Sequence, residues 1–226
     1  MLSNKTIAKR LLPQIPVKLL LVLLLFLASL ITFGFLIREV VIEKEEKIDS
    51  YLFSLFPGPA SADTINTMEL ISYLGSGIFL LPAYLLIIAY TFRKRRFLLG
   101  IHIMIIAVSG YVLVYGLKLL FERSRPGSPL IETLKNYSFP SGHTVSAFIF
   151  CSIVVYLTFK SNLAVWWKSL ILVGMVCLAF VVGISRVILQ VHYPTDVIAG
   201  ASVGMIWVML GFWLLNKLKI KRISNK

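Results

Sequence analysis

Long apolar stretches separated by short polar ones dominate the pattern of this chain. Six stretches contain no Asp, Glu, Lys or Arg, and they cover residues 19–37, 70–92, 97–117, 144–159, 169–184 and 197–216. A helix that spans a bilayer needs about 17 to 25 mostly apolar residues. The fourth and fifth stretches are short by this measure, and polar residues at one end of each extend them into the protein interior. The pattern therefore predicts six transmembrane helices.

The composition supports this membrane assignment. Hydrophobic residues make up 58% of the 226 residues, and the mean hydropathy of +0.87 is too high for a soluble domain of this length. We find no internal repeat, low-complexity tract or linker. The first apolar stretch is long for a secretory signal and no small-residue cleavage site follows it. We expect one all-α polytopic domain over residues 1–226, with the first helix retained.

The charges predict the orientation of the spans. If both termini are cytoplasmic, the inner segments hold fifteen basic residues and no acidic one, while all ten acidic residues lie outside with eight basic ones. Cytoplasmic loops collect Lys and Arg, so we expect cytoplasmic N- and C-termini in the cell membrane. The basic clusters are short and flank helices, where anionic lipids attract them. We therefore expect no nucleic-acid partner despite the pI near 9.9.

The outer segment 38–69 has a charged half followed by Tyr51, Phe53 and Phe56, and then the breaker sequence at residues 57–59. Two interpretations stay open: a short helix with aromatic side chains in the headgroup region, or a plain extension of the second helix. A further hypothesis is that this segment acts as a lid or a lipid entry point.

Cys151 and Cys177 lie singly within the fourth and fifth apolar stretches. Free Cys commonly serves there as a small hydrophobic residue. We expect neither a disulfide nor a Cys metal site.

Three polar clusters fall at the outer ends of the predicted helices. In the first, Arg125 and Pro126 follow seven positions after Lys118. Seven residues on a continuing helix are two turns, or about 10 Å on one face, although Pro126 disfavours helix at Arg125. The two cations are placed to bind one small anion. The alternative is that both side chains extend to lipid headgroups.

The second cluster is Ser141, Gly142 and His143 at the start of the fourth helix. Ser141 is a favourable N-cap residue, and Gly142 lets an anion approach the free amides of the first turn. The alternative is a capped helix with an incidental His.

The third cluster joins the fifth and sixth helices and contains Ser185, Arg186, His192 and Asp196. His192 and Asp196 are four residues apart across Pro194, a spacing that suits the first turn of a helix. A carboxylate bound to one ring nitrogen leaves the other as a nucleophile. The alternative is a structural ion pair between Asp196 and Arg186. The third histidine, His102, lies away from these clusters and is expected to be a packed helix residue.

Together the three clusters resemble the signature of the type 2 phosphatidic acid phosphatase superfamily, in order and spacing. The resemblance implies an acid phosphatase/haloperoxidase-like helical bundle and a lipid phosphatase with a phosphohistidine intermediate. It implies His192 as nucleophile, Asp196 as the residue that orients it and His143 as general acid. The residues implied to hold the phosphate are Lys118, Arg125, Ser141, Gly142, Ser185 and Arg186.

Phosphoryl transfer depends mainly on positioning and charge stabilisation, which fixed cations supply. The outer loops lack a carboxylate cluster suited to Mg²⁺, so we expect no metal and no cofactor. The partners expected are the bilayer and a membrane lipid phosphate, with no obligate protein partner. Two branches fit this layout, the phosphatidylglycerophosphatase B and the undecaprenyl pyrophosphate phosphatase types.

Other functions fit the sequence less well. An anion transporter needs polar or broken helices near the midplane, and the middles of these spans carry no charged residue. Six spans disfavour a vanadate haloperoxidase. A lipid phosphotransferase and a non-catalytic phospholipid-binding protein remain as alternatives.

Overall fold

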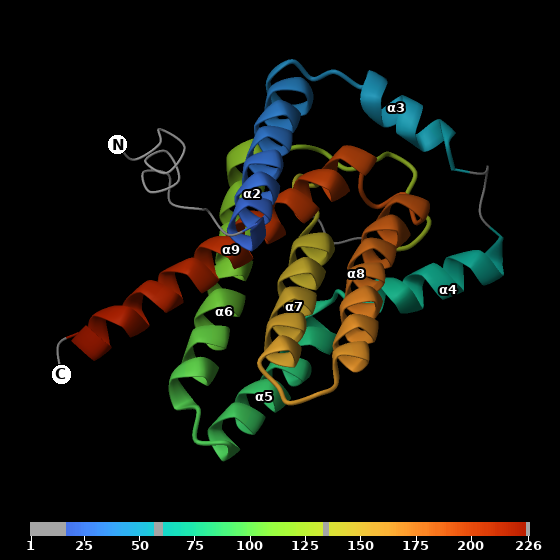
Figure 1. The fold of residues 1–226 in the computed structure, drawn as a ribbon. Coiled ribbons are helices and arrows are strands. Elements are labelled where there is room, and N and C mark those ends of the chain that lie inside the picture. The colour runs from blue at the N-terminus through green and yellow to red at the C-terminus, as the bar shows by residue number, and fades with distance from the viewer. Residues whose placement is uncertain (1–16, 57–60, 133–135, 225–226) are drawn as a thin grey trace, which may run out of the picture.

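The computed structural model describes residues 17–56, 61–132 and 136–224, and the regular elements of these residues are all helices (Figure 1). In chain order they are α2 (Val17–Leu36), the π-helical turn η1 (Ile37–Ile42), α3 (Lys47–Ser54), α4 (Ala62–Tyr73), α5 (Gly77–Arg93), α6 (Phe97–Phe121), α7 (Gly142–Phe159), α8 (Val165–Ile188) and α9 (Pro194–Ser224).

Six helical stretches are long and apolar enough to cross a bilayer, which confirms the prediction. They are Leu19–Ile42, Ala62–Arg93, Phe97–Phe121, Gly142–Phe159, Val165–Ile188 and Pro194–Leu214. Their positions follow the predicted apolar stretches because lipid offers no hydrogen bonds, so the backbone must satisfy its own.

The outer segment before the second span contains more helix than the sequence pattern predicts. Both open interpretations hold in part, because α3 is a separate short helix and α4, which begins at Ala62, extends the second span. The side chain of Ser61 caps this helix by accepting a hydrogen bond from the backbone N–H of Thr64. Because α4 contains polar residues, the hydropathy pattern does not predict it as part of the second span. The breaker sequence at residues 57–59 lies outside the described residues.

Helix α7 lies at the centre of the bundle and packs against α6, α8 and α9. Its inward side chains Val145, Ile149 and Ile153 are buried in one apolar cluster with Ile103 of α6 and Val203 of α9. A core of this kind fixes the separation of the helices to within a methyl group, because protein interiors are close-packed.

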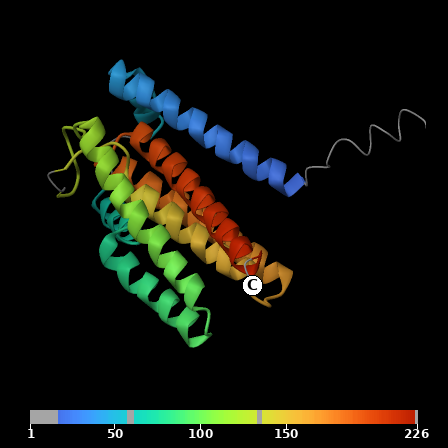
Figure 2. The same ribbon diagram turned by 90° about the vertical axis from the view of Figure 1, so that its left-hand side faces the viewer.

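Glycines let α9 approach α7 closely at the outer end. A Cβ atom at Gly200 would lie 2.8 Å from the carbonyl oxygen of Ser141, and one at Gly204 would lie 2.8 Å from Cβ of Phe148. Helix α2 packs on the other side of α9, at the edge of the bundle (Figure 2). The first turns of α7 and α9 are therefore held side by side.

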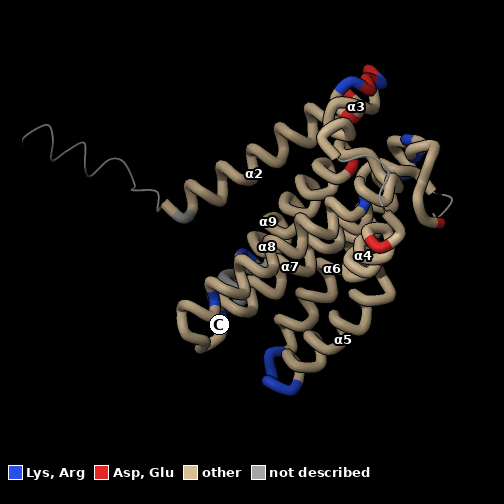
Figure 3. The backbone as a smooth tube through the Cα atoms, turned by 90° about the vertical axis from the view of Figure 1, so that its right-hand side faces the viewer, with Lys and Arg blue, Asp and Glu red and all other residues tan. Residues whose placement is uncertain are grey.

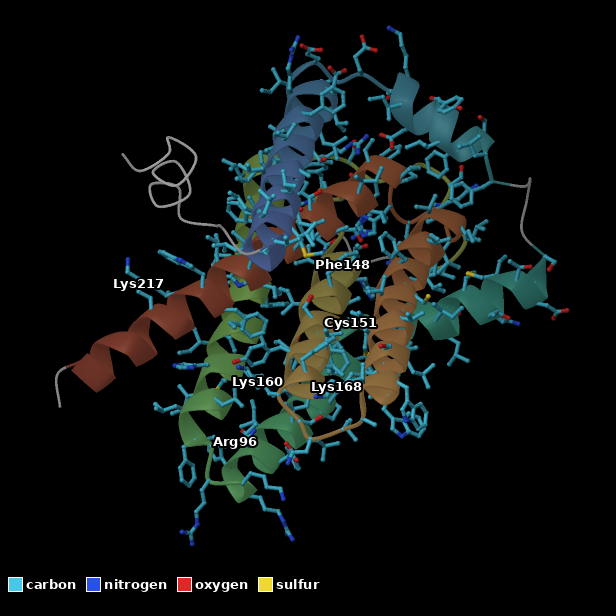
Figure 4. The ribbon with its side chains drawn as sticks, viewed as in Figure 1. Arg96, Phe148, Cys151, Lys160, Lys168 and Lys217 are labelled. Atoms are coloured by element: carbon cyan, nitrogen blue, oxygen red, sulfur yellow. The ribbon has the colours of Figure 1, made fainter. Side chains whose placement is uncertain are left out.

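The charged residues gather at the two ends of the bundle (Figure 3). Acidic residues lie at the end that carries α3. The loop between α5 and α6 at the opposite end is basic, and Arg96, Lys160 and Lys168 all lie toward that end (Figure 4). The separation of charge along the bundle matches the pattern expected for a multi-pass membrane protein.

Candidate active site

The site is built around His192 and Asp196, in the turn from α8 into α9. The backbone N–H of His192 donates to the carbonyl of Arg186, which folds the chain back from the end of α8. Helix α9 then begins at Pro194, as the spacing predicts. The Nδ1 atom of His192 lies 3.4 Å from Oδ2 of Asp196, and both side chains are buried. The carboxylate and the imidazole therefore form a buried pair one helical turn apart.

Two further donors hold the same carboxylate oxygen. Oδ2 of Asp196 accepts hydrogen bonds from the backbone N–H of Tyr193, at 2.9 Å, and from the hydroxyl of Ser138. The Ser138 oxygen also lies 3.2 Å from Nδ1 of His192. Because acceptors surround Nδ1, this atom carries the ring proton of the neutral imidazole. The lone pair then lies on Nε2.

Burial sets the charge of His192. It lowers the pKa of His192 from 6.5 to about 4, although the hydrogen bond and the charge of Asp196 act in the opposite direction. Removing the imidazole from water disfavours its charged form, and the nearby Lys118 and Arg125 add to this effect. His192 is therefore neutral at neutral pH, the form that a nucleophile requires.

Arg123 is the cation paired with Asp196. Its Nη1 lies 2.6 Å from Oδ1 of Asp196, and its Nη2 lies 2.6 Å from Oδ2 of Asp49 on α3. The alternative considered from the sequence, an ion pair between Asp196 and Arg186, is wrong. Sequence reasoning missed Arg123, Asp49 and Ser138. The one sequence signal for Arg123 was its position between Lys118 and Arg125, the two cations of the first cluster.

Arg125 approaches the free nitrogen of the imidazole. Its Nη1 donates to the carbonyl of Val191 at 2.7 Å and lies 3.4 Å from Nε2 of His192. Its Nε donates to the carbonyl of Asn136 at 3.0 Å, and Nη2 donates to the side chain of the same residue. Helix α6 ends at Phe121 and does not continue to Arg125. A loop, and not a helix face, therefore positions this guanidinium.

Lys118 lies at the last turn of α6 and is buried. Its ammonium donates to the carbonyls of Tyr137 and Ser138. A Cβ atom at Gly142 would lie 3.8 Å from Cε of Lys118. The end of α6 thus lies beside the first turn of α7, which brings the first two predicted clusters together.

Ser141 is the N-cap residue of α7, as predicted, but its hydroxyl makes no capping bond to this helix. It accepts instead from the hydroxyl of Thr144, at 2.9 Å. The backbone N–H of Ser141 donates to the carbonyl of Asp196 at 3.0 Å. This bond ties the start of α7 directly to the first turn of α9.

His143 and Arg186 complete the cluster. The electrostatic influence of Arg186, His192, Arg125 and Lys118 reaches His143 in the first turn of α7. Arg186 is buried and donates through Nη1 to the hydroxyl of Ser72 on α4, while its Nε has no hydrogen-bond partner among the described residues. A buried N–H of this kind favours an anionic acceptor. The neighbouring Ser185 is buried and donates to the carbonyl of Val182 within α8.

The arrangement fits chemistry on a phosphate group. The uncharged imidazole has Arg125 beside its free nitrogen and Asp196 beside the other, while two further cations, Lys118 and Arg186, are buried in the last turns of α6 and α8. Such a site offers charge stabilisation from fixed groups, which phosphoryl transfer needs more than covalent chemistry.

Comparison with known proteins gives consistent matches. The family profile of the PAP2 superfamily matches residues 97–220. The chain is 34% identical over 169 residues to phosphatidylglycerophosphatase B of Bacillus subtilis, covering 71% of this chain and 79% of that protein. It is 40% identical over 89 residues to the bacitracin transport permease protein BcrC of Bacillus licheniformis, covering 39% of each chain.

Two solved structures are similar. The crystal structure of a transmembrane PAP2-type phosphatidylglycerolphosphate phosphatase from Bacillus subtilis superposes with a TM-score of 0.73 and 28% identity, covering 87% of this chain and 96% of that chain. The Aquifex aeolicus LpxE structure gives a TM-score of 0.57 and 27% identity, covering 72% and 93% of the two chains.

Proposed function

The chain belongs to the PAP2 superfamily and is a membrane-embedded lipid phosphatase, and we propose that it removes phosphate from phosphatidylglycerophosphate through a phosphohistidine intermediate. The observation that carries the mechanism is the buried pair of His192 and Asp196, with Nδ1 facing the carboxylate and Nε2 facing Arg125.

In the proposed first step, Nε2 of His192 attacks phosphorus and the bond from phosphorus to the lipid oxygen breaks. The imidazole becomes cationic as this bond forms, and Asp196 stabilises the charge and the orientation of the ring. His143 donates a proton to the leaving lipid oxygen. Water then attacks the phosphohistidine and gives its proton to His143, which releases inorganic phosphate and restores both histidines.

The phosphoryl oxygens are bound by fixed donors in this proposal. Arg125, Arg186 and Lys118 supply positive charge, and the free Nε of Arg186 supplies a donor that the described protein residues leave unused. The backbone N–H groups of Gly142 and His143, at the start of α7, add further donors to the phosphoryl oxygens. The hydroxyls of Ser141 and Ser185, predicted to hold phosphate, are paired within the protein, so the proposal gives these residues a supporting role in the backbone around the site. These groups make a metal ion unnecessary for the reaction.

The asymmetry of charge supports an orientation with both termini in the cytoplasm. The acidic end of the bundle, with α3 and the candidate site, then faces outward (Figure 3). In this arrangement the enzyme acts at the outer face of the cell membrane.

The length of the sequence match favours phosphatidylglycerophosphate as the substrate, since it extends over most of the chain. Undecaprenyl pyrophosphate is the second candidate, as the substrate of the other branch that the sequence pattern resembles. A pocket that holds one terminal phosphate with cations accepts either headgroup.

Phosphate release by the purified protein in lipid nanodiscs tests the proposal. We expect release from phosphatidylglycerophosphate, unaffected by EDTA and absent in His192→Ala. Faster release from undecaprenyl pyrophosphate would transfer the assignment to that lipid. Phosphate that appears on an added alcohol in place of water would identify a transferase, and lipid binding without turnover would leave only a binding protein.

A further inference from the structure

Helix α3 places a carboxylate against the candidate site. Asp49 is 2% exposed, whereas the other charged residues at the start of this helix, Glu46 and Lys47, are exposed. The exposed side of α3 carries Tyr51 and Leu55, which are suited to contact with lipid headgroups and acyl chains. Asp49 therefore faces the protein from a helix whose other side faces outward.

Every oxygen of Asp49 is used. Oδ2 accepts from Nη2 of Arg123 at 2.6 Å and from the hydroxyl of Thr195 at 2.8 Å, and Oδ1 accepts from the backbone N–H of Thr195 at 2.9 Å. Thr195 lies in the first turn of α9, where a negative charge is favourable. Asp49 thus binds the residue that directly precedes Asp196.

Arg123 links the two carboxylates. One arm of its guanidinium binds Asp49, and the other binds Asp196 at 2.6 Å and the Thr195 hydroxyl at 2.9 Å. The guanidinium of Arg123 also lies 4.0 Å from the ring centroid of Tyr193. The ring of Tyr193 in turn packs against Phe53 of α3, with 6.1 Å between the ring centroids. The planar fork of Arg suits such a bidentate contact, and Lys does not reproduce it.

Stability alone does not account for this arrangement. Buried charges lose their hydration, and well-packed apolar residues in their place often stabilise a fold as much as a buried ion pair does, or more. What the charges add here is direction, because the two oxygens of Asp196 bind different sets of partners. Oδ1 binds Arg123, and Oδ2 remains directed at His192 and Ser138.

We propose that Asp49 is a positioning residue that fixes the orientation of Asp196 through Arg123. Efficient catalysis then requires α3 to be packed against the site. This proposal rests on the phosphatase activity proposed above. The hydrogen bonds of Asp49 and Arg123 lead to Thr195, to Asp196 and to each other, so the proposal assigns them an action through Asp196.

The first test compares kcat and KM for Asp49→Asn and Asp49→Glu with the matched control Asp63→Asn, which removes an exposed carboxylate from α4. Outer partners of an oriented catalytic group typically contribute about 10–100-fold. We expect Asp49→Asn to lower kcat by that amount with KM changed less than about twofold. Asp49→Glu should recover part of the loss, and Asp63→Asn should match the wild type.

A double-mutant cycle with Arg123→Gln tests whether the two residues act as one unit. Their effects on kcat should be strongly non-additive, since either change breaks the same link. Additive effects, a kcat for Asp49→Asn within about twofold of the wild type, or a loss that only tracks a lower Tm would overturn the proposal.

A measurement without turnover separates this proposal from the phosphatase activity. The chain has three histidines, so ¹⁵N-histidine NMR in detergent, with His192 assigned from His192→Gln, reports its tautomer. We expect Nδ1–H in the wild type and a mixture of tautomers in Asp49→Asn. An unchanged His192 signal in Asp49→Asn would refute the positioning role even if the wild type proved inactive toward every lipid tested.

Discussion

His192 and Asp196 lie one turn apart, with Nδ1 of the imidazole 3.4 Å from Oδ2 of the carboxylate. Because the carboxylate holds the protonated nitrogen, the other nitrogen is left to react. The geometry around this pair leads to five predictions.

Replacing the two histidines should separate nucleophile from acid. His192→Ala should abolish lipid phosphatase activity, by a factor of about 10⁴ or more. His143→Ala should lower kcat by about 10²–10⁴, the usual contribution of a general acid, and leave measurable activity. Steady-state phosphate release measures both, with Tm in the same detergent as control. Equal losses of activity matched by equal losses of Tm would make both residues structural.

The acid side of the pH profile should lie unusually low. Burial lowers the pKa of His192 to about 4, so this nucleophile stays neutral down to about that pH. Its protonation should therefore reduce kcat/KM near pH 4 and not near 6.5. An acid limb of kcat/KM centred near pH 6.5 would contradict the burial argument.

The same pKa shift should make stability depend on pH. Above pH 6.5 His192 is neutral in both folded and unfolded chains. Between 6.5 and about 4 the unfolded chain binds a proton that the folded chain does not, so stability falls as the pH is lowered through this window. The decrease in Tm over this range should be smaller in His192→Asn than in the wild type.

Arg125→Lys should not behave as a conservative change. The guanidinium makes separate bonds to Asn136 and Val191 and also faces His192. A point charge on a flexible stem cannot reproduce this fork, and we expect kcat/KM to fall by about tenfold or more. Arg38→Lys, at an exposed position, is the matched control and should retain wild-type kinetics.

Gly200→Ala should disturb the site by changing the packing of α9 against α7. Its Cβ would lie 2.8 Å from the Ser141 carbonyl and 3.0 Å from Cβ of Thr144, so α7 and α9 must separate. Overpacking of this kind typically costs about 1–3 kcal/mol, and we expect a lower Tm together with lower kcat. Gly174→Ala, where a Cβ meets nothing within 4 Å, should leave both unchanged or raise Tm slightly. Equal Tm values for the two variants would refute the packing argument.

Hydropathy predicted the six spans because the lipid constraint acts on each helix separately. It placed the start of the second span too late, since Asp63, Asn66 and Glu69 interrupt the apolar pattern within α4. In that helix, capping by Ser61 and packing against α8 outweigh the polar composition. The local sequence of α4 gives no information about its packing against α8, so the start of the second span could be predicted only in part.

The sequence by itself determined the membrane architecture and the chemical groups of the site, since apolar length and the order of Lys, Arg, His and Asp are local properties. The tertiary structure alone decided which cation pairs with Asp196. Arg123 is 73 residues from Asp196 and 74 from Asp49, and no spacing rule relates residues at such separations. Their meeting depends on how α3 docks and on how closely Gly200 lets α9 approach α7. A buried carboxylate binds whichever cation that packing places beside it.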